Sequence, residues 1–332
     1  MARNVDRRVD SMLREAVLHG RYVVPRSRAD RLALERRVER GLLLSPIKGC
    51  YVDSARYGEL SLRGRALAAI RTLAELHPQW VFCSYSAALL FGLQIPYAFL
   101  DKVHIAVGGH QSRRRCPNSL QFHVVEGDGP VTVQGILATT LQRTLLDCAC
   151  QAPFRYGLAI VDSALHWELV SRSELEAYFR LHGKGRMGIK TAREVLRWCD
   201  GRSENGGESV ARATIIKLGF MVPELQVEVT DPMNPNTTSR VDMFWRLPDG
   251  RVIIGELDGM QKYRQAAAGP DDMGVISALA RERRREARLN LTGATVIRFS
   301  YAEAEDSNYM FRLLSRAGVP LVRRSRVDKW DI

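Results

Sequence analysis

The sequence lacks several signals that assign proteins to metal-binding, disulfide-linked or membrane classes. Its six cysteines form no CxxC pair and its seven histidines are scattered, so no zinc-binding spacing is present. No run of about 18 apolar residues suggests a transmembrane helix. The charged N-terminus has no apolar signal core. We therefore expect a cytoplasmic protein with reduced thiols and no membrane contact.

A nucleotide-binding loop is also absent. The glycine-rich stretch Gly183–Thr191 carries Ile189 where a phosphate loop requires a lysine directly after the second glycine. The stretch also follows a predicted helix rather than a buried strand. We expect it to be a flexible basic connector that leads into a helix over residues 189–199.

Positive charge is abundant instead. Of 332 residues, 49 are Lys or Arg and 37 are Asp or Glu, so the formal net charge is +12. Residues 1–56 contribute half of this excess. Such an excess favours a polyanionic partner, because phosphate contacts dominate nucleic-acid affinity. On net charge alone, a solvated basic surface is an equally good interpretation.

The first 57 residues predict a small DNA-binding domain. Apolar residues repeat at helical spacing over residues 5–18, and an arginine-rich helix is expected over residues 33–40. A hairpin that carries Lys48 follows. Helices followed by such a hairpin are typical of a winged helix, whose recognition helix lies in the major groove while the wing touches the backbone. The expected DNA contacts on this helix are Arg36, Arg37 and Arg40; an arginine-rich helix that is only solvated is the alternative.

Residues 58–199 predict an α/β domain. A long helix is expected over residues 60–77, after which strands and helices alternate. The predicted strands cover residues 80–83, 102–107, 119–125 and 132–136. The predicted helices cover residues 84–91, 139–150, 156–167 and 173–181. A polar, glycine-rich linker at residues 200–207 then separates this domain from a C-terminal domain over residues 203–332.

The C-terminal domain centres on a predicted β-hairpin. Residues 248–250, Pro-Asp-Gly, have the composition of a tight turn. A three-residue loop of this kind is closed by Leu247 and Arg251. Continuing the antiparallel pairing from that closure places Asp242 opposite Glu256.

Three carboxylates then share one face of the hairpin. Asp258 points to the same side as Glu256 because strand side chains alternate, and Arg240 lies opposite Asp258. Convergent acids make Asp242 and Glu256 candidate ligands for Mg²⁺ or Mn²⁺. In the alternative interpretation, Glu256 only pairs with an arginine. The apolar positions expected to form the other, buried face are Val241, Met243, Trp245, Ile253 and Leu257.

A strongly basic helix is expected over residues 276–291, before a strand over residues 295–299. Arg284 and Arg285 on this helix are candidate DNA contacts. Its i, i+4 charges are also typical of a surface laced with ion pairs.

Residues from about 203 to 305 resemble the C-terminal domain of actinobacterial proteins related to very-short-patch-repair endonucleases, in the PD-(D/E)XK superfamily. This resemblance implies a mixed-sheet core flanked by helices and metal-dependent hydrolysis of DNA. Under it Asp242 and Glu256 hold the metal ion, Asp258 belongs to the same catalytic group, and Glu208 assists from the preceding helix. The matching pieces are Glu208, Leu218–Phe220, Pro223–Val227, Arg240–Asp242, Glu256–Gly259, Arg284, Leu289, Gly293 and Val296–Phe299.

The chain departs from the general E-x-K pattern of that superfamily, because Asp258 stands at the lysine position. The residues expected to replace the lysine are Lys262, Arg284 or Arg285. A domain that binds DNA without cutting it has the same pattern and is kept as an alternative.

Residues from about 5 to 180 resemble AbiEi-type antitoxins of abortive-infection systems. The matching pieces are the arginine-rich winged helix ending at Gly49–Val52, Ser84–Leu93 and Thr140–Asp147. This resemblance implies a regulator that binds its own promoter and has a nucleotidyltransferase-like toxin as partner. The sequence thus favours a DNA-cutting enzyme first and a non-catalytic regulator second. A third interpretation is a structural module whose acids pair with the arginine-rich helix.

Overall fold

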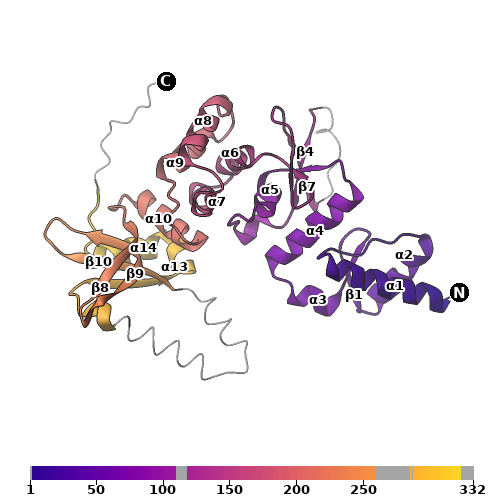
Figure 1. Ribbon diagram of the computed structural model, residues 1–332, viewed down its shortest axis with the longest axis horizontal. Helices are drawn as coiled ribbons and strands as arrows, with labels where there is room; N and C mark the ends of the chain where they lie inside the picture. The colour runs from indigo at the N-terminus through magenta and orange to yellow at the C-terminus, as the bar shows by residue number, and fades with distance from the viewer. Residues whose placement is uncertain (1, 110–117, 259–284, 286, 323–332) are drawn as a thin grey trace. The chain divides into compact units, whose positions relative to one another are not determined.

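The computed structural model describes residues 2–109, 118–258, 285 and 287–322 (Figure 1). The chain forms two compact units, which we call unit 1 (Met1–Gln151 and Arg172–Ile189) and unit 2 (Ala152–Ser171 and Lys190–Ile332). Both contain helices and β-strands, so the mixed α/β class predicted from the sequence is confirmed. Within the described residues, no helix combines the length and apolar character that a membrane crossing needs.

The N-terminal part of unit 1 holds two helices and a hairpin. Helix α1 (Ala2–Leu18) packs on α2 (Arg28–Glu39), and strands β1 (Leu43–Ile47) and β2 (Cys50–Asp53) pair antiparallel. Helix α2 begins earlier than predicted, because the Ser27 side chain caps it by accepting the Asp30 N–H. The buried core here comes from both helices and both strands: Val9, Met12, Ala16, Val23, Ala33, Leu34, Leu43 and Tyr51.

A five-stranded sheet follows α3 (Ser54–Glu59) and α4 (Leu62–Leu76). Its order is β5-β4-β3-β7-β6, and it mixes parallel and antiparallel neighbours. The strands are β3 (Val81–Phe82), β4 (Val103–Val107), β5 (Leu120–Val124), β6 (Val131–Val133) and β7 (Ile136–Ala138). The single strand predicted over residues 132–136 was wrong, because Gln134 and Gly135 adopt positive φ and turn the chain back on itself.

Helices cover this sheet. Helix α5 (Ser84–Leu90) follows β3, the short helix η1 (Tyr97–Phe99) precedes β4, and α6 (Leu141–Gln151) follows β7. Helix α8 (Arg172–His182) returns to pack on α6. This return explains why residues 172–189 belong to unit 1.

Unit 2 combines three helices from the middle of the chain with a C-terminal sheet. Helix α7 (Phe154–His166) packs closely on α10 (Gly206–Leu218), and a buried ion pair of 2.7 Å between Asp162 and Arg212 joins them. Helix α9 (Ile189–Trp198) lies between them in sequence. Because α7 packs on α10, residues 152–171 and 190–199 belong to the same unit as the C-terminal sheet. The sequence had placed these residues in the segment 58–199, apart from the segment 203–332.

The sheet of unit 2 has the order β11-β10-β9-β8. Strands β8 (Glu224–Asp231), β9 (Asn234–Arg246) and β10 (Val252–Asp258) are antiparallel, while β11 (Thr295–Ser300) runs parallel to β10. The predicted hairpin register is confirmed where the strands pair, because Ile253 faces Trp245 and Gly255 faces Met243. The turn is closed as expected, with Leu247 N–H donating to Arg251 O at 2.9 Å.

Both faces of this sheet are covered, which corrects the prediction of one apolar and one acidic face. Helix α10 and the C-terminal helices α13 (Tyr301–Glu305) and α14 (Ser307–Ala317) pack against Met243, Trp245 and Ile253. Phe244 and Ile254 point the other way and are buried with Leu289 and Ala294. Val241 joins this second cluster, although alternation placed it with Met243.

Candidate functional site

The exposed side of α2 is the first candidate site. Two charge pairs fix the opposite side of α2 to α1. Arg8 pairs with the buried carboxylate of Asp30 near the start of α2. Arg37 Nη1 lies 2.6 Å from Asp10 Oδ1 near its end. These pairs set the orientation of α2, so its remaining side is presented to solvent.

That side carries a row of basic residues. Arg28, Arg36 and Arg40 are exposed and recur with Leu32 at four-residue spacing, so they form one stripe along the helix. Lys48 is exposed in the turn between β1 and β2. Arg37, which was expected beside them, is instead directed at the acids of α1 and is mostly buried. Arg28 was missed because the helix was predicted to begin only at residue 33.

The second candidate site is the group of acids on the sheet of unit 2. Asp242 lies on β9, and its Oδ2 accepts the N–H of Leu257 on β10 at 2.9 Å. The charge of Asp242 raises the pKa of both Glu208 and Glu256. Asp242 therefore lies close enough to act on both glutamates, as the hairpin register predicted for Glu256.

Glu208 reaches this group from the first turn of α10. Its side chain is buried, and its Oε2 accepts the Glu204 N–H at 2.8 Å and the Gln226 amide at 3.1 Å. Burial first, and then the charge of Asp242, raise the pKa of Glu208 to about 7. Gln226 has φ +54, a left-handed conformation that non-glycine residues rarely adopt. Backbone strain of this kind clusters at functional sites.

Glu256 is held by an arginine. Arg285 Nη2 donates to Glu256 Oε1 at 2.9 Å and Arg285 Nη1 donates to Oε2 at 3.3 Å. Arg285 also donates to the carbonyl oxygen of Arg240. Burial raises the pKa of Glu256 to about 7, because it outweighs the opposing effect of the Arg285 charge. This contact is the pairing that the third interpretation of the sequence expected.

The outer end of the hairpin differs from the prediction. Arg240 was expected opposite Asp258, but its guanidinium pairs with Glu204. Asp258 instead lies 3.7 Å from Arg298 on β11. The physical reason is that β10 leaves β9 and pairs with β11, where Glu256 faces Arg298. Asp258 is also more exposed than Glu256, so it does not belong to the buried carboxyl groups around Asp242.

The remaining predicted site residues on this side, Lys262 and Arg284, lie outside the described residues. Among the residues that are described, no three His, Cys, Asp or Glu side chains gather closely enough to hold a metal ion. The assignment of Asp242 and Glu256 as metal ligands therefore stays a prediction.

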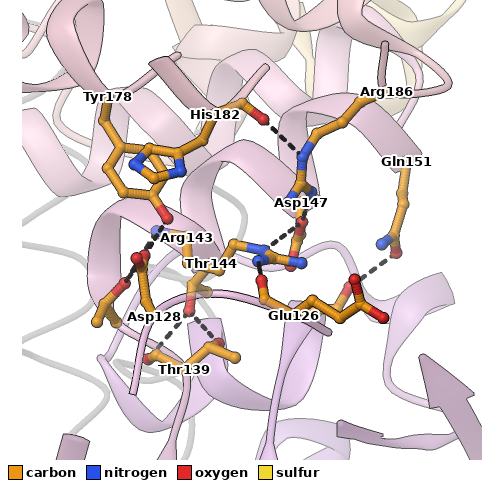
Figure 2. A network of polar contacts seen from close by, with 12 residues as sticks. Glu126, Asp128, Thr139, Arg143, Thr144, Asp147, Gln151, Tyr178, His182 and Arg186 are labelled. Atoms are coloured by element: carbon orange, nitrogen blue, oxygen red, sulfur yellow. Dashed lines mark hydrogen bonds and ion pairs between the residues drawn. The ribbon is translucent and has the colours of Figure 1, made fainter. Parts of the chain in front are cut away.

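A third polar group lies in unit 1 and was not predicted as a site. Arg143 and Asp147, four residues apart on α6, form a buried ion pair with Nε and Oδ2 at 2.9 Å. Arg186 Nη1 approaches the same carboxylate at 2.5 Å. Figure 2 shows both guanidinium groups directed at Asp147. The Tyr178 hydroxyl of α8 contacts Asp128 in the same network.

This network includes Arg186, which lies in the stretch predicted to be a flexible connector into α9. Arg186 also donates from Nε to the His182 carbonyl oxygen at 2.8 Å. A Cβ added at Gly188 would lie 2.0 Å from the Cys150 carbonyl oxygen, so the backbone packs directly on the end of α6. Residues 183–189 therefore connect α8 to α9 and pack against α6. The four-residue spacing of Arg143 and Asp147 is the signal in the sequence for the first ion pair. The second cation on Asp147, Arg186, lies 39 residues further along the chain and left no such signal.

Comparisons with known proteins agree with part of the sequence-based resemblance. Residues 81–198 match the family of the AbiEi antitoxin C-terminal domain. The match covers the five-stranded sheet of unit 1 and continues through α9. It stops before the sheet of unit 2, so the resemblance of that sheet to repair endonucleases stays a prediction.

Two curated proteins of Mycobacterium tuberculosis are similar over most of the chain. They are the uncharacterised protein Rv2248 of strain ATCC 25618 / H37Rv and the uncharacterised protein MT2308 of strain CDC 1551 / Oshkosh. Each is 32% identical over 267 residues, covering 80% of this chain and 89% of the relative. The chain belongs to the same family as these two mycobacterial proteins and contains an AbiEi antitoxin C-terminal domain.

Proposed function

We propose that the protein is a DNA-binding regulator of the antitoxin type, without catalytic activity of its own. The single observation that carries this proposal is the match of residues 81–198 to an antitoxin domain. In this chain that domain follows an N-terminal segment with exposed arginines on α2. The partners that fit the proposal are the promoter of its own operon and a nucleotidyltransferase-like toxin.

The arrangement of helices supports a winged-helix mode of DNA contact. Helix α2 precedes the β1–β2 hairpin directly, and the bridge between Val23 and Tyr51 holds the hairpin against the helical pair. In a winged helix, the recognition helix enters the major groove and the wing touches the backbone. The stripe of Arg28, Arg36 and Arg40 would lie in the major groove and contact the phosphates along its edges, and Lys48 would contact a phosphate from the wing.

The test is DNA affinity measured as a function of salt. Fluorescence anisotropy would follow binding to a labelled fragment from upstream of the gene, with an unrelated fragment of equal length for comparison. We expect Arg36→Ala with Arg40→Ala to lower the affinity roughly tenfold for each lost phosphate contact at about 0.1 M salt, and to flatten the salt dependence.

The matched control removes two exposed arginines that pair with acids, Arg172→Ala with Arg251→Ala. This control changes the net charge equally and should leave affinity close to wild type. Wild-type protein that shifts neither fragment would refute DNA binding. Equal loss in both double variants would show that net charge, rather than α2, carries the affinity.

The acids of unit 2 support a second candidate function, a metal-dependent nuclease. The specific observation is that Asp242 acts on two buried glutamates, each with a pKa raised to about 7. Carboxyl groups poised near neutral pH suit acid–base work, and paired carboxylates suit Mg²⁺. Supercoiled plasmid incubated with Mg²⁺ or Mn²⁺ would be nicked by wild type and left intact by Glu256→Gln. Plasmid left intact by both proteins would remove this candidate.

A further inference from the structure

One large apolar side chain lies in the middle of the basic stripe on α2. Leu32 is four residues after Arg28 and four before Arg36, so the three share one side of the helix. Leu32 is 49% exposed, whereas the adjacent Ala33 and Leu34 are buried in the core. Single exposed leucines are common on proteins, so exposure alone carries little weight. The position of Leu32 among the cations is what indicates a role.

The first turns of α2, which carry Leu32, are firmly held. The Ser27 hydroxyl accepts the Asp30 N–H at 3.1 Å, and Arg8 Nε donates to the buried Asp30 carboxylate at 2.7 Å. Leu32 is the fifth residue of α2. In helix-turn-helix proteins, residues near the N-terminus of the recognition helix contact the base edges. A side chain on a fixed turn also loses little order on binding.

The charged groups around Leu32 suit a polyanionic partner. Arg36 Nε donates to the Leu32 carbonyl oxygen at 3.2 Å, so its guanidinium lies back along the helix towards Leu32. Glu35 is directed at Tyr51 of β2, where burial first, and then the charge of Glu35, raise the pKa of the tyrosine. Glu39 lies on the same side as Leu32 but seven residues, or roughly 10 Å, further along the axis. Cations therefore flank Leu32 on this side of α2.

The partner that matches such a surface combines an apolar group with surrounding negative charge. In the major groove of DNA, the C5 methyl group of thymine is the apolar group on the base edges, and phosphates line the groove. A leucine packed on that methyl group removes apolar surface of both partners from water. A second copy of this chain fits less well, because its own Arg28 and Arg36 would meet the same cations.

We infer that Leu32 packs on the C5 methyl group of a thymine in the major groove, and so gives sequence preference to a helix whose arginines contact phosphates. The inference rests on the proposed DNA-binding function and deepens it, because it names the base chemistry that α2 recognises. Uracil in place of that thymine removes the methyl group alone, which allows a direct test.

The experiment compares two forms of the fragment from upstream of the gene, one with thymine and one with uracil at every thymine position. For wild type, we expect the uracil form to bind about fourfold more weakly for each methyl group that Leu32 buries. Leu32→Ala should bind both forms with nearly equal affinity. Leu32→Met keeps an unbranched apolar side chain and should keep the preference for thymine.

Two controls separate a base contact from other effects. Arg40→Ala removes a cation from the same helix, so it should weaken binding to both forms by the same factor and leave their ratio unchanged. Leu181→Ala removes an exposed leucine of α8 and should change neither the affinity nor the preference.

Equal binding of wild type to both forms would overturn the inference and leave the proposed function standing. An equal loss on uracil for wild type and Leu32→Ala would also overturn it, because the shape of the duplex would then be the cause. If Leu32→Ala dissociates a dimer in sedimentation and keeps the preference for thymine, Leu32 contacts a second copy instead. Wild type that binds neither form would refute the proposed function itself, and the inference with it.

Discussion

The buried glutamates of unit 2 make its stability fall as pH rises through neutrality. Glu208 and Glu256 each have a folded-state pKa of about 7, against an ordinary value of 4.5. A carboxyl group whose pKa is raised by folding binds more protons in the folded state, so its contribution is present at low pH. That contribution is lost as pH rises from about 4.5 to about 7. At about 1.36 kcal/mol per pKa unit, each glutamate destabilises unit 2 by about 3 kcal/mol once fully ionised.

Urea unfolding at pH 5 and pH 8 would measure this effect. For wild type, we expect the free energy of unfolding of unit 2 to be several kcal/mol lower at pH 8. Replacing either Glu208 or Glu256 with Gln removes one titrating group, so each variant should lose about 2 to 3 kcal/mol of that difference. The two losses are not expected to add fully, because both glutamates interact with Asp242.

Glu303 provides a control of opposite sign. The Ser300 N–H and hydroxyl bond its carboxylate and lower its pKa, so its contribution is present above pH 4.5 and is lost as pH falls. Glu303→Gln should therefore leave the fall in stability between pH 5 and pH 8 unchanged. If Glu208→Gln and Glu256→Gln behave like Glu303→Gln, the acids are solvated and the cluster described for unit 2 does not exist.

Two further substitutions test the contacts that hold each unit together. Asp162→Ala leaves the Arg212 guanidinium buried without its carboxylate, so unit 2 should lose about 3–5 kcal/mol in urea unfolding, while Asp249→Ala at an exposed pair should change little. Gly188→Ala forces a Cβ against the Cys150 carbonyl oxygen, so the melting temperature should fall further than for Gly185→Ala. Both glycines have positive φ, but only at Gly188 does an added Cβ meet another atom of the protein. Equal falls in melting temperature would show that Gly188 does not pack against the end of α6.

Local signals in the sequence were sufficient for much of the fold. The turn composition at residues 248–250 predicted the register of β9 and β10, because a short loop leaves few ways to pair the strands that flank it. Apolar periodicity located α1, α4, α5, α6 and α8 to within a few residues, but it placed the start of α2 at residue 33 instead of 28 and did not indicate α3. The exposure of Arg36 and Arg40 also followed from periodicity, because side chains opposite the buried stripe face water.

Contacts between distant segments were not predictable in the same way. The predicted hairpin register placed Asp242 beside Glu256. It contained no information about the parallel strand β11, which carries Arg298, the ion-pair partner of Asp258. Likewise, Arg186 reaches Asp147 only because α8 folds back onto α6. Charge alone offered many partners for each acid, and the backbone path chose among them.

The charges around the acid group of unit 2 favour the regulator over the nuclease. Burial raises the pKa of both glutamates towards neutrality, so near pH 7 the group carries less negative charge than three fully ionised carboxylates would. The guanidinium of Arg285 already bonds both oxygens of Glu256. A divalent ion would have to displace this guanidinium and release protons before the glutamates could bind it, so its affinity would be weak at neutral pH and rise with pH. The guanidinium of Arg285 also bonds the carbonyl oxygen of Arg240, so it contacts β9 as well as β10.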